Sequence, residues 1–206
     1  SNPDLNNTVI DAWSMRHWDS SRRIGHDRFF DTFGKFGLAN TGRVGEMLAE
    51  VSARAAANHV SYLELMQTLD GGVFAGLGAR AGYTADFAAS RDKLLRSGLR
   101  DSLARVRAAL DAAEAKRRAL LRCDTNTPDA GCAVTVRYLY QVLRGLPPEV
   151  VFAQILGGFE LARADSRVVG FNLVMPEDAV VPMRDFTLHM AIIDYLHGVY
   201  PGVHIT

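Results

Sequence analysis

Apolar residues recur along this chain with two different spacings. Spacings of three and four residues predict a short helix within 7–23 and further helices over 43–58, 84–122, 147–164 and 182–198. Continuous or alternating apolar runs predict strands over 59–68, 133–143 and 168–175, and 202–206 has the pattern of another strand beginning. Strand-helix units in this order predict a parallel sheet, either doubly wound or part of a barrel.

Several segments carry more specific expectations. The apolar runs 59–68 and 168–175 are typical of buried strands, the latter covered on both faces. Gly98 interrupts 84–122, so that segment forms one helix or two. The glycine-rich segment 71–82 lacks the lysine of a phosphate-binding loop and is expected to be a flexible loop. Phenylalanines at helical spacing are ordinarily core residues; here they are Phe29, Phe30, Phe33 and Phe36.

Size and charge limit the classes of partner. The 206 residues, 48% of them hydrophobic, suffice for one domain with a core. Lysine and arginine number 23 and so do aspartate and glutamate, so no overall charge draws the chain to nucleic acid. No run approaches the roughly 20 apolar residues of a membrane helix. We therefore expect neither a nucleic-acid nor a membrane partner.

The two cysteines, Cys123 and Cys132, flank a polar segment in which Pro128 and Gly131 favour chain reversal. A loop this short can close as a disulfide, which would indicate a periplasmic or secreted protein. The alternative is a pair of free thiols, which fits a cytoplasmic protein. The spacing does not match a redox or zinc pair.

Metal-binding and nucleophile motifs are absent from the sequence. The six histidines form no HxH or HExxH pair, and His189 and His197 lie too far apart along one helix to share an ion. There is no GxSxG elbow and no nucleotide-binding glycine motif. Glu64 is a charged residue within an apolar run, so it needs a hydrogen-bond or ion-pair partner if it is buried. A structural ion pair or hydrogen bond is the favoured role, and catalysis is the alternative.

Polar residues follow the best-defined strand. Asn172, Glu177 and Asp178 come at the carboxyl end of segment 168–175, where parallel-sheet enzymes gather their ligand contacts. Glu177 and Asp178 either bind a polar edge of a substrate or cap the helix that follows.

The succession FFDTFGKFG, EMLAEVSARAAANHVSYLELMQT, RYLYQVLR, VVGFNLVMPEDAVVPMRDFTLHM and YPGVHIT resembles the adenosine deaminase family across nearly the whole chain. The resemblance implies a (β/α)8 TIM-type barrel with zinc at its mouth. In that family an HxH pair, the histidine of a His-Ala-Gly-Glu motif and a late aspartate hold the metal, which activates a water for attack on the purine ring.

None of these zinc ligands is present here. The resemblance implies that residues 1–206 form a single partial barrel domain, truncated at both ends, with about strands 2 to 5 and their helices. The HxH strand would precede Ser1, and the His-Ala-Gly-Glu motif would follow Thr206. We therefore expect zinc in the parent protein but none in this fragment, and no catalytic residue within it.

The same resemblance identifies substrate-binding residues. Phe29, Phe30 and Phe33 match the family's helix that roofs the purine pocket. Asn172 to Glu177 matches the family's Asp-Leu-Ala-Gly-Asp-Glu segment, whose glycine contacts the purine. This chain has Asn172 in place of the first aspartate and Met175 or Pro176 in place of the glycine.

The resulting expectation is a fragment of a zinc-dependent hydrolase that deaminates adenosine or a related purine nucleoside, inactive in isolation. The alternative is a non-catalytic α/β interaction or scaffold domain derived from the same fold. A partial barrel exposes sheet edges and strand faces, so we also expect a homo-oligomer or swapped dimer of the fragment.

Overall fold

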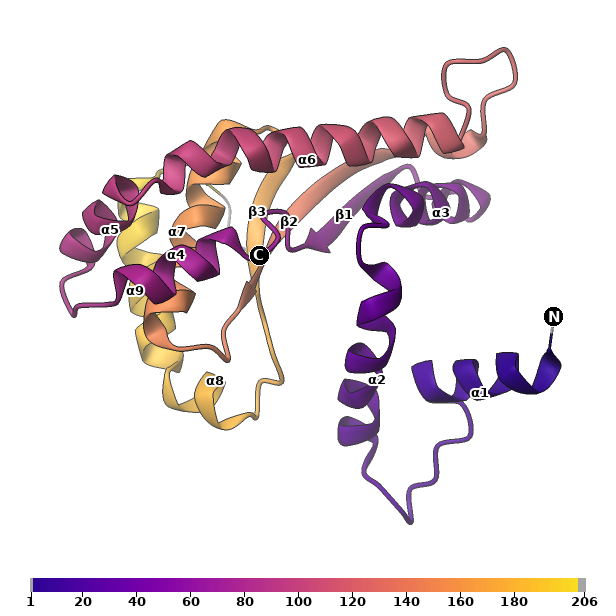
Figure 1. The fold of residues 1–206 in the computed structure, drawn as a ribbon, viewed down its shortest axis with the longest axis horizontal. Coiled ribbons are helices and arrows are strands. Elements are labelled where there is room, and N and C mark those ends of the chain that lie inside the picture. The colour runs from indigo at the N-terminus through magenta and orange to yellow at the C-terminus, as the bar shows by residue number, and fades with distance from the viewer. Residues whose placement is uncertain (1, 204–206) are drawn as a thin grey trace.

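Three parallel strands form one sheet in the computed structural model, which describes residues 2–203 (Figure 1). They are β1 (Tyr62–Gln67), β2 (Thr135–Leu143) and β3 (Val168–Val174), in the order β1-β2-β3. Each lies within a predicted strand segment. Gly202 and Val203 are not in a strand, and the rest of the strand predicted over 202–206 lies outside the described residues.

Helices make up most of the rest of the fold. They are α1 (Pro3–Trp13), α2 (Gly25–Asn40), α3 (Val44–Ala57), α4 (Val73–Ala81), α5 (Phe87–Arg96), α6 (Leu99–Leu120), α7 (Pro148–Ala164), α8 (Val180–Arg184) and α9 (Phe186–Val199), with a 3-10 turn, η1 (Ala130–Ala133). The segment 84–122 forms two helices because Gly98 adopts a φ of +91°, a left-handed conformation that ends α5 before α6 begins. The helix predicted over 182–198 is divided at Asp185 into α8 and α9.

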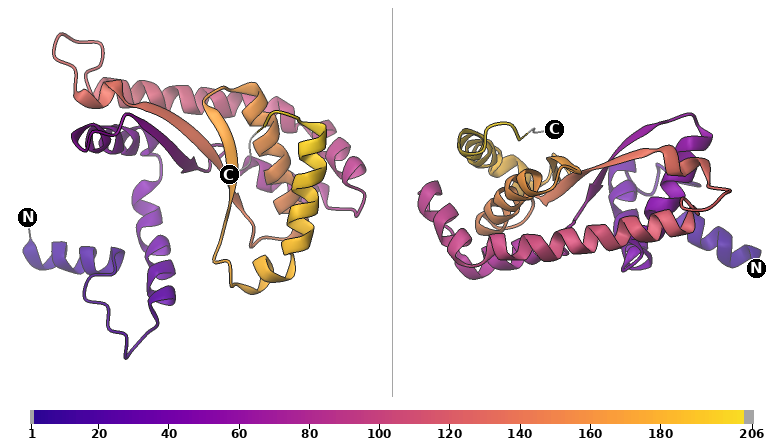
Figure 2. Two further views of the ribbon diagram at one scale, coloured as in Figure 1. Left: turned by 180° about the vertical axis from the view of Figure 1, so that it is seen from behind. Right: turned by 90° about the horizontal axis from the view of Figure 1, so that it is seen from above.

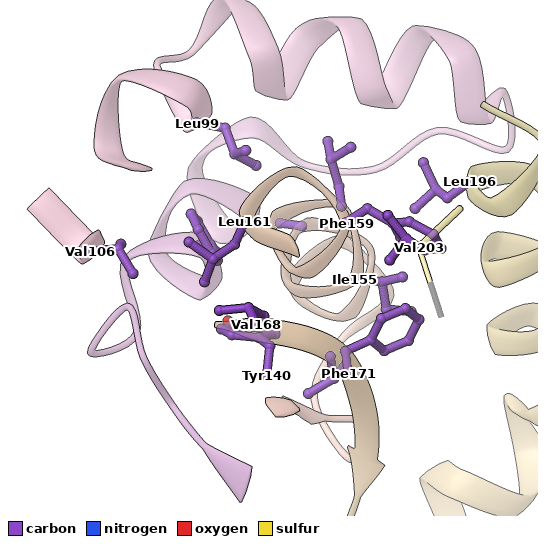
Figure 3. Packing of buried hydrophobic residues seen from close by; sticks show 14 of the residues in the cluster. Leu99, Val106, Tyr140, Ile155, Phe159, Leu161, Val168, Phe171, Leu196 and Val203 are labelled. Atoms are coloured by element: carbon purple, nitrogen blue, oxygen red, sulfur yellow. The ribbon is translucent and has the colours of Figure 1, made fainter. Parts of the chain in front are cut away.

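The hydrophobic core lies between one face of the sheet and the helices. Alternate residues of β2 are buried against the helices, namely Val136, Tyr138, Tyr140 and Val142. Every residue of α7 from Val150 to Leu161 is buried, since this helix lies between β2, β3 and the other helices. Ile155 and Phe159 of α7 point toward Tyr140 and Phe171 of the sheet (Figure 3).

The opposite face of the sheet is much less covered. In β1 the burial alternates between exposed and half-buried residues, and Tyr62 and Met66 are 47% and 45% exposed. The prediction that 59–68 is a buried strand is therefore wrong: β1 is an edge strand with one face open. The last three residues of β3 are only half-buried, so the prediction that both faces of 168–175 are covered is also wrong.

In the view from above, α6 runs along one side of the sheet (Figure 2).

The glycine-rich segment 71–82 is a helix, α4, not the predicted flexible loop. Gly78 allows α4 to pack closely against α7, because a Cβ on this residue would lie 2.4 Å from the carbonyl oxygen of Glu149. The carboxylate of Asp70, before α4, accepts hydrogen bonds from the Phe74 amide at 2.7 Å and the Tyr140 hydroxyl at 3.1 Å. Gly78 thus serves helix packing, whereas a Cβ on Gly76 would meet only the end of the Arg80 side chain, at 3.4 Å.

Helices α1 and α2 extend away from the sheet and its helices (Figures 1 and 2). Phe29 and Phe33 of α2 are 47% and 49% exposed, and none of the four stripe phenylalanines belongs to the main core, so the core interpretation of the stripe is wrong. Within residues 2–203, no helix is both long enough and apolar enough to cross a membrane.

Candidate functional site at the carboxyl ends of the strands

The residues predicted after β3 lie together at the carboxyl end of the sheet. Asn172 is half-buried and pairs in register with Gln141 of β2. Met175 packs across Gly145, since its Cε lies 2.7 Å from the position that a Cβ on that glycine would occupy. Glu177 extends into solvent with its side chain 91% exposed. The carboxyl ends of β2 and β3 therefore form one continuous surface.

Arg144 lies beneath this surface, as the first residue after β2. Its backbone amide donates to the Val174 carbonyl over 3.1 Å, which holds it beside the end of β3. Its side chain is 9% exposed, and Glu177 Oε1 lies 3.9 Å from Nη2, beyond hydrogen-bond distance. Within the described part of the chain, Nε has no hydrogen-bond partner. A buried guanidinium with so weak a partner is costly to fold.

A second buried polar side chain, His189, lies in the first turn of α9. It is 1% exposed, and neither ring nitrogen finds a hydrogen-bond partner among residues 2–203. Burial lowers the pKa of His189 below the ordinary histidine value; the charge of Asp185 opposes this and that of Arg144 reinforces it. Asp185 is itself bound by Arg184 through two hydrogen bonds of 2.8 and 2.7 Å.

Helix α2 reaches the loop after β3 through His26. Its Nε2 lies 3.1 Å from Asp178 Oδ1, and its Nδ1 lies 3.0 Å from Asp27 Oδ1. The hydrogen bond to Asp27 raises the pKa of His26, desolvation opposes the rise, and Asp178 adds to it. The ring of Phe30 lies 4.8 Å from that of His26, centroid to centroid. The start of the aromatic helix and the loop after β3 therefore meet.

The structure brings only part of the predicted substrate-binding set together. Asn172, Met175 and Glu177 lie at the end of β3 or directly after it, and Phe30 approaches that loop through His26. Phe29 and Phe33 pack on each other with ring centroids 5.2 Å apart and remain half exposed. The polar contact between their helix, α2, and the loop is made by His26 with Asp178.

The alternative role predicted for Glu177 and Asp178, helix capping, is not seen. Helix α8 begins after Ala179 with no side-chain cap, and α9 begins after Asp185 with none. Glu64 lies exposed on the open sheet face and accepts a 2.7 Å hydrogen bond from the Tyr62 hydroxyl. Its charge therefore needs no buried partner.

Cys123 and Cys132 form a disulfide across the loop after α6, with their Cα atoms 5.5 Å apart. The loop is anchored further by the Asp129 amide, which donates to the Leu121 carbonyl over 2.9 Å. This loop follows α6 and precedes β2, at the amino end of that strand. The disulfide is therefore remote from the carboxyl ends where Arg144 and His189 lie.

Sequence reasoning did not select Arg144, His26 or His189 as functional residues. The available signal for Arg144 is an arginine directly after an alternating apolar strand, but the strand itself also contains an arginine, Arg137. His189 lies among the apolar residues of its helix, a position that also fits an ordinary core histidine. His26 carried no local signal, because its partner Asp178 is 152 positions away.

Comparison with known proteins adds no further assignment. No family model matches the chain, and no curated protein or solved structure matches it either. The resemblance to adenosine deaminases therefore stays a prediction from the sequence.

Proposed function

We propose that this chain is part of a zinc-dependent aminohydrolase that deaminates adenosine or a related purine nucleoside, and that residues 1–206 alone are inactive. The observation that carries the proposal is the placement of Asn172, Met175 and Glu177 at the carboxyl ends of parallel strands, beside an aromatic helix. Parallel α/β enzymes bind their substrates at this end of the sheet.

The sheet supports a partial barrel. Its order is β1-β2-β3, with each strand added on the same side of the last. Right-handed crossovers then place the connecting helices on one face, as in a barrel, and leave the other face open. A doubly wound sheet reverses its strand order at a switch point, and the three described strands contain no reversal.

Zinc does not fit the described residues by themselves. Among residues 2–203 no group of three His, Cys, Asp or Glu side chains is placed to hold a metal ion. In the proposed parent protein the ligands belong to motifs outside this sequence, and the metal supplies an activated water.

The roles proposed for the residues of this chain concern substrate binding. The amide of Asn172 offers a donor and an acceptor to the nucleoside, and Met175 offers an apolar contact above Gly145. Phe29, Phe30 and Phe33 provide aromatic surface that stacks on a purine when α2 closes over the strand ends.

The disulfide between Cys123 and Cys132 supports a periplasmic or secreted location, because such bonds persist in oxidising compartments. A non-catalytic scaffold domain is the second candidate. It predicts a parent protein without zinc ligands, whereas the hydrolase proposal predicts zinc ligands in the parent; the described residues, which hold no metal-binding group, fit both.

The experiment compares the parent protein with the 1–206 chain. Ammonia release from adenosine is measured for both, with zinc content by mass spectrometry; we expect activity and one zinc only in the parent. Phe29→Ala with Phe33→Ala in the parent should raise KM about tenfold through lost stacking, and Ile24→Ala, just before α2 and 62% exposed, is the control. Stoichiometric zinc on residues 1–206, or a parent inactive on purine nucleosides, would refute the proposal.

A further inference from the structure

We propose that Arg144 and His189 form a binding site for a small phosphate group at the carboxyl end of β2, a site that goes beyond the deaminase function proposed above. Both side chains are more than nine-tenths buried. Nε of Arg144 and both ring nitrogens of His189 lack hydrogen-bond partners within the described chain. The site therefore consists of three polar atoms without partners among residues 2–203, one on Arg144 after β2 and two on His189 of α9.

The charge balance calls for an anion. Arg144 is permanently cationic. The carboxylate of Glu177 forms an ion pair with it over 3.9 Å. The neighbouring acids are engaged elsewhere: Asp185 binds Arg184 at 2.8 and 2.7 Å, and Asp178 contacts His26 at 3.1 Å. The guanidinium therefore has an unfilled capacity for a bidentate oxyanion.

Glu177 is positioned to be displaced by such a ligand. Its side chain is 91% exposed and makes no hydrogen bond with Arg144 at its present distance. Because Glu177 is almost fully exposed and the two atoms are 3.9 Å apart, this pair contributes little free energy. A phosphate group entering from the solvent side would replace a weak partner with a strong one.

The histidine distinguishes phosphate from a carboxylate. Burial lowers the pKa of His189, with Arg144 lowering it further and Asp185 opposing, so the ring is neutral at neutral pH. A neutral imidazole has one donor and one acceptor nitrogen. A singly protonated phosphate can accept from the first and donate to the second, whereas a carboxylate has no proton to donate. A phosphate group therefore offers a partner of the right kind to Nε of Arg144 and to both ring nitrogens of His189.

Helix ends add to the field at this site. Helix α7, of 17 residues, begins at Pro148, four residues after Arg144, and α9, of 14 residues, carries His189 in its first turn. The amino ends of helices favour anions. They reinforce the two buried side chains that define the site.

The test measures binding of inorganic phosphate to the 1–206 chain by calorimetry, at constant ionic strength set with chloride. Arg144→Gln should weaken binding about tenfold or more, since it removes a charged donor. Glu177→Gln should tighten binding about threefold, because it removes the competing carboxylate. Arg163→Gln and Glu50→Gln, at exposed positions elsewhere, are matched controls with no expected effect.

Two further readouts keep the proposal falsifiable if Arg144→Gln does not fold. Phosphate should raise the pKa of His189 in an NMR titration of the unmodified chain, since an anion favours the imidazolium. Glu177→Gln changes an exposed residue and should fold normally. An unchanged Kd in Glu177→Gln together with no response at His189 would overturn the proposal.

Adenosine 5′-monophosphate and adenosine serve as further ligands. Tighter binding of the monophosphate than of inorganic phosphate, lost with Arg144→Gln, identifies a nucleotide as the source of the phosphate group. Equal binding of both phosphates identifies a free phosphate. Binding of neither phosphate overturns the site, whether or not the parent protein deaminates adenosine, so the two proposals fail separately.

Discussion

The imidazole of His26 lies 3.1 Å from the carboxylate of Asp178, so the first turn of α2 contacts the loop after β3. The two residues are 152 positions apart, and the contact links the extended α1–α2 segment to the carboxyl end of the sheet. His26 is held on its other side by Asp27 at 3.0 Å. A protonated histidine between two carboxylates makes this contact sensitive to pH.

The contact between α2 and the loop should weaken as pH rises. The pKa of His26 is raised in the folded protein, first by its hydrogen bond to Asp27, against desolvation, and further by Asp178. A raised histidine pKa contributes stability that is complete below the unfolded value and is lost as pH rises through the folded value. Hydrogen exchange of α2 amides should therefore accelerate between pH 6 and pH 8, beyond the intrinsic pH effect, roughly the range in which a histidine titrates.

His26→Gln should remove this excess acceleration, because glutamine does not titrate. Asp178→Asn should reduce the excess acceleration without abolishing it, because the contact of His26 with the adjacent Asp27 remains. His59→Gln is the control, since that histidine is exposed at the end of α3. If α2 amides in the unmodified chain follow the intrinsic pH dependence alone, the His26 contact does not hold the helix.

Gly78→Ala should destabilise the fold. The added Cβ would lie 2.4 Å from the Glu149 carbonyl oxygen and 2.8 Å from the Ala153 Cβ, so α4 and α7 must separate. Overpacking of this kind costs about 2 kcal/mol. Urea unfolding measures the change, and a free energy of unfolding equal to that of the unmodified chain would contradict the close packing.

Gly76→Ala provides a control within the same helix. Its added Cβ would meet only the Arg80 guanidinium, at 3.4 Å, the flexible end of a side chain. Alanine is favoured over glycine inside a helix by about 0.8 kcal/mol. We therefore expect opposite signs for two substitutions that lie two residues apart on α4.

The sequence pattern predicts the strands and most helices of this fold well. Alternation along 133–143 identifies β2, and its buried residues are Val136, Tyr138, Tyr140 and Val142. Pro148 at the start and Gly98 as an interruption are local signals whose physical basis needs no tertiary information. These predictions are confirmed because each depends on neighbouring residues alone.

The incorrect predictions depend on what covers a surface. An apolar run such as 59–68 fits a buried strand, yet β1 lies at the edge of the sheet with one face open. The glycine-rich sequence of 71–82 fits a loop as well as a helix, unless the close approach of α7 to Gly78 is known. The pairing of His26 with Asp178, and the burial of Arg144 and His189, likewise arise only from the tertiary fold. Local patterns cannot specify partners so distant in sequence.

Glu160→Gln should destabilise the packing of α7 against α6 and the segment after α9. The carboxylate accepts hydrogen bonds from Arg100 at 3.0 and 2.7 Å and from the Tyr200 hydroxyl at 2.5 Å. Burial raises the pKa of Glu160, but these hydrogen bonds outweigh it and leave the pKa below its ordinary value. Losing the charge should cost about 2 kcal/mol, moderated by the half-exposed Arg100.

The pH dependence of unfolding checks the same cluster. A lowered glutamate pKa contributes stability that is present above the unfolded value and is lost as pH falls through the folded value. The difference in stability between the unmodified chain and Glu160→Gln should therefore shrink as the solution is acidified below the ordinary glutamate pKa. Glu50→Gln, on the exposed face of α3, should show no such convergence. A difference independent of pH would contradict the ionised state of Glu160.

The open sheet face should drive association of the 1–206 chain. Tyr62 and Met66 of β1 are 47% and 45% exposed on this face, and β1 and β3 are the edge strands of the described sheet. Exposed edges and apolar strand faces pair with other copies. Sedimentation velocity should show a concentration-dependent dimer, and Met66→Glu should weaken it about tenfold by placing a charge in the interface. Met183→Glu, on α8 and 65% exposed, is the matched control. A strict monomer at high concentration, or equal weakening by both substitutions, would mean that the sheet face is not the contact.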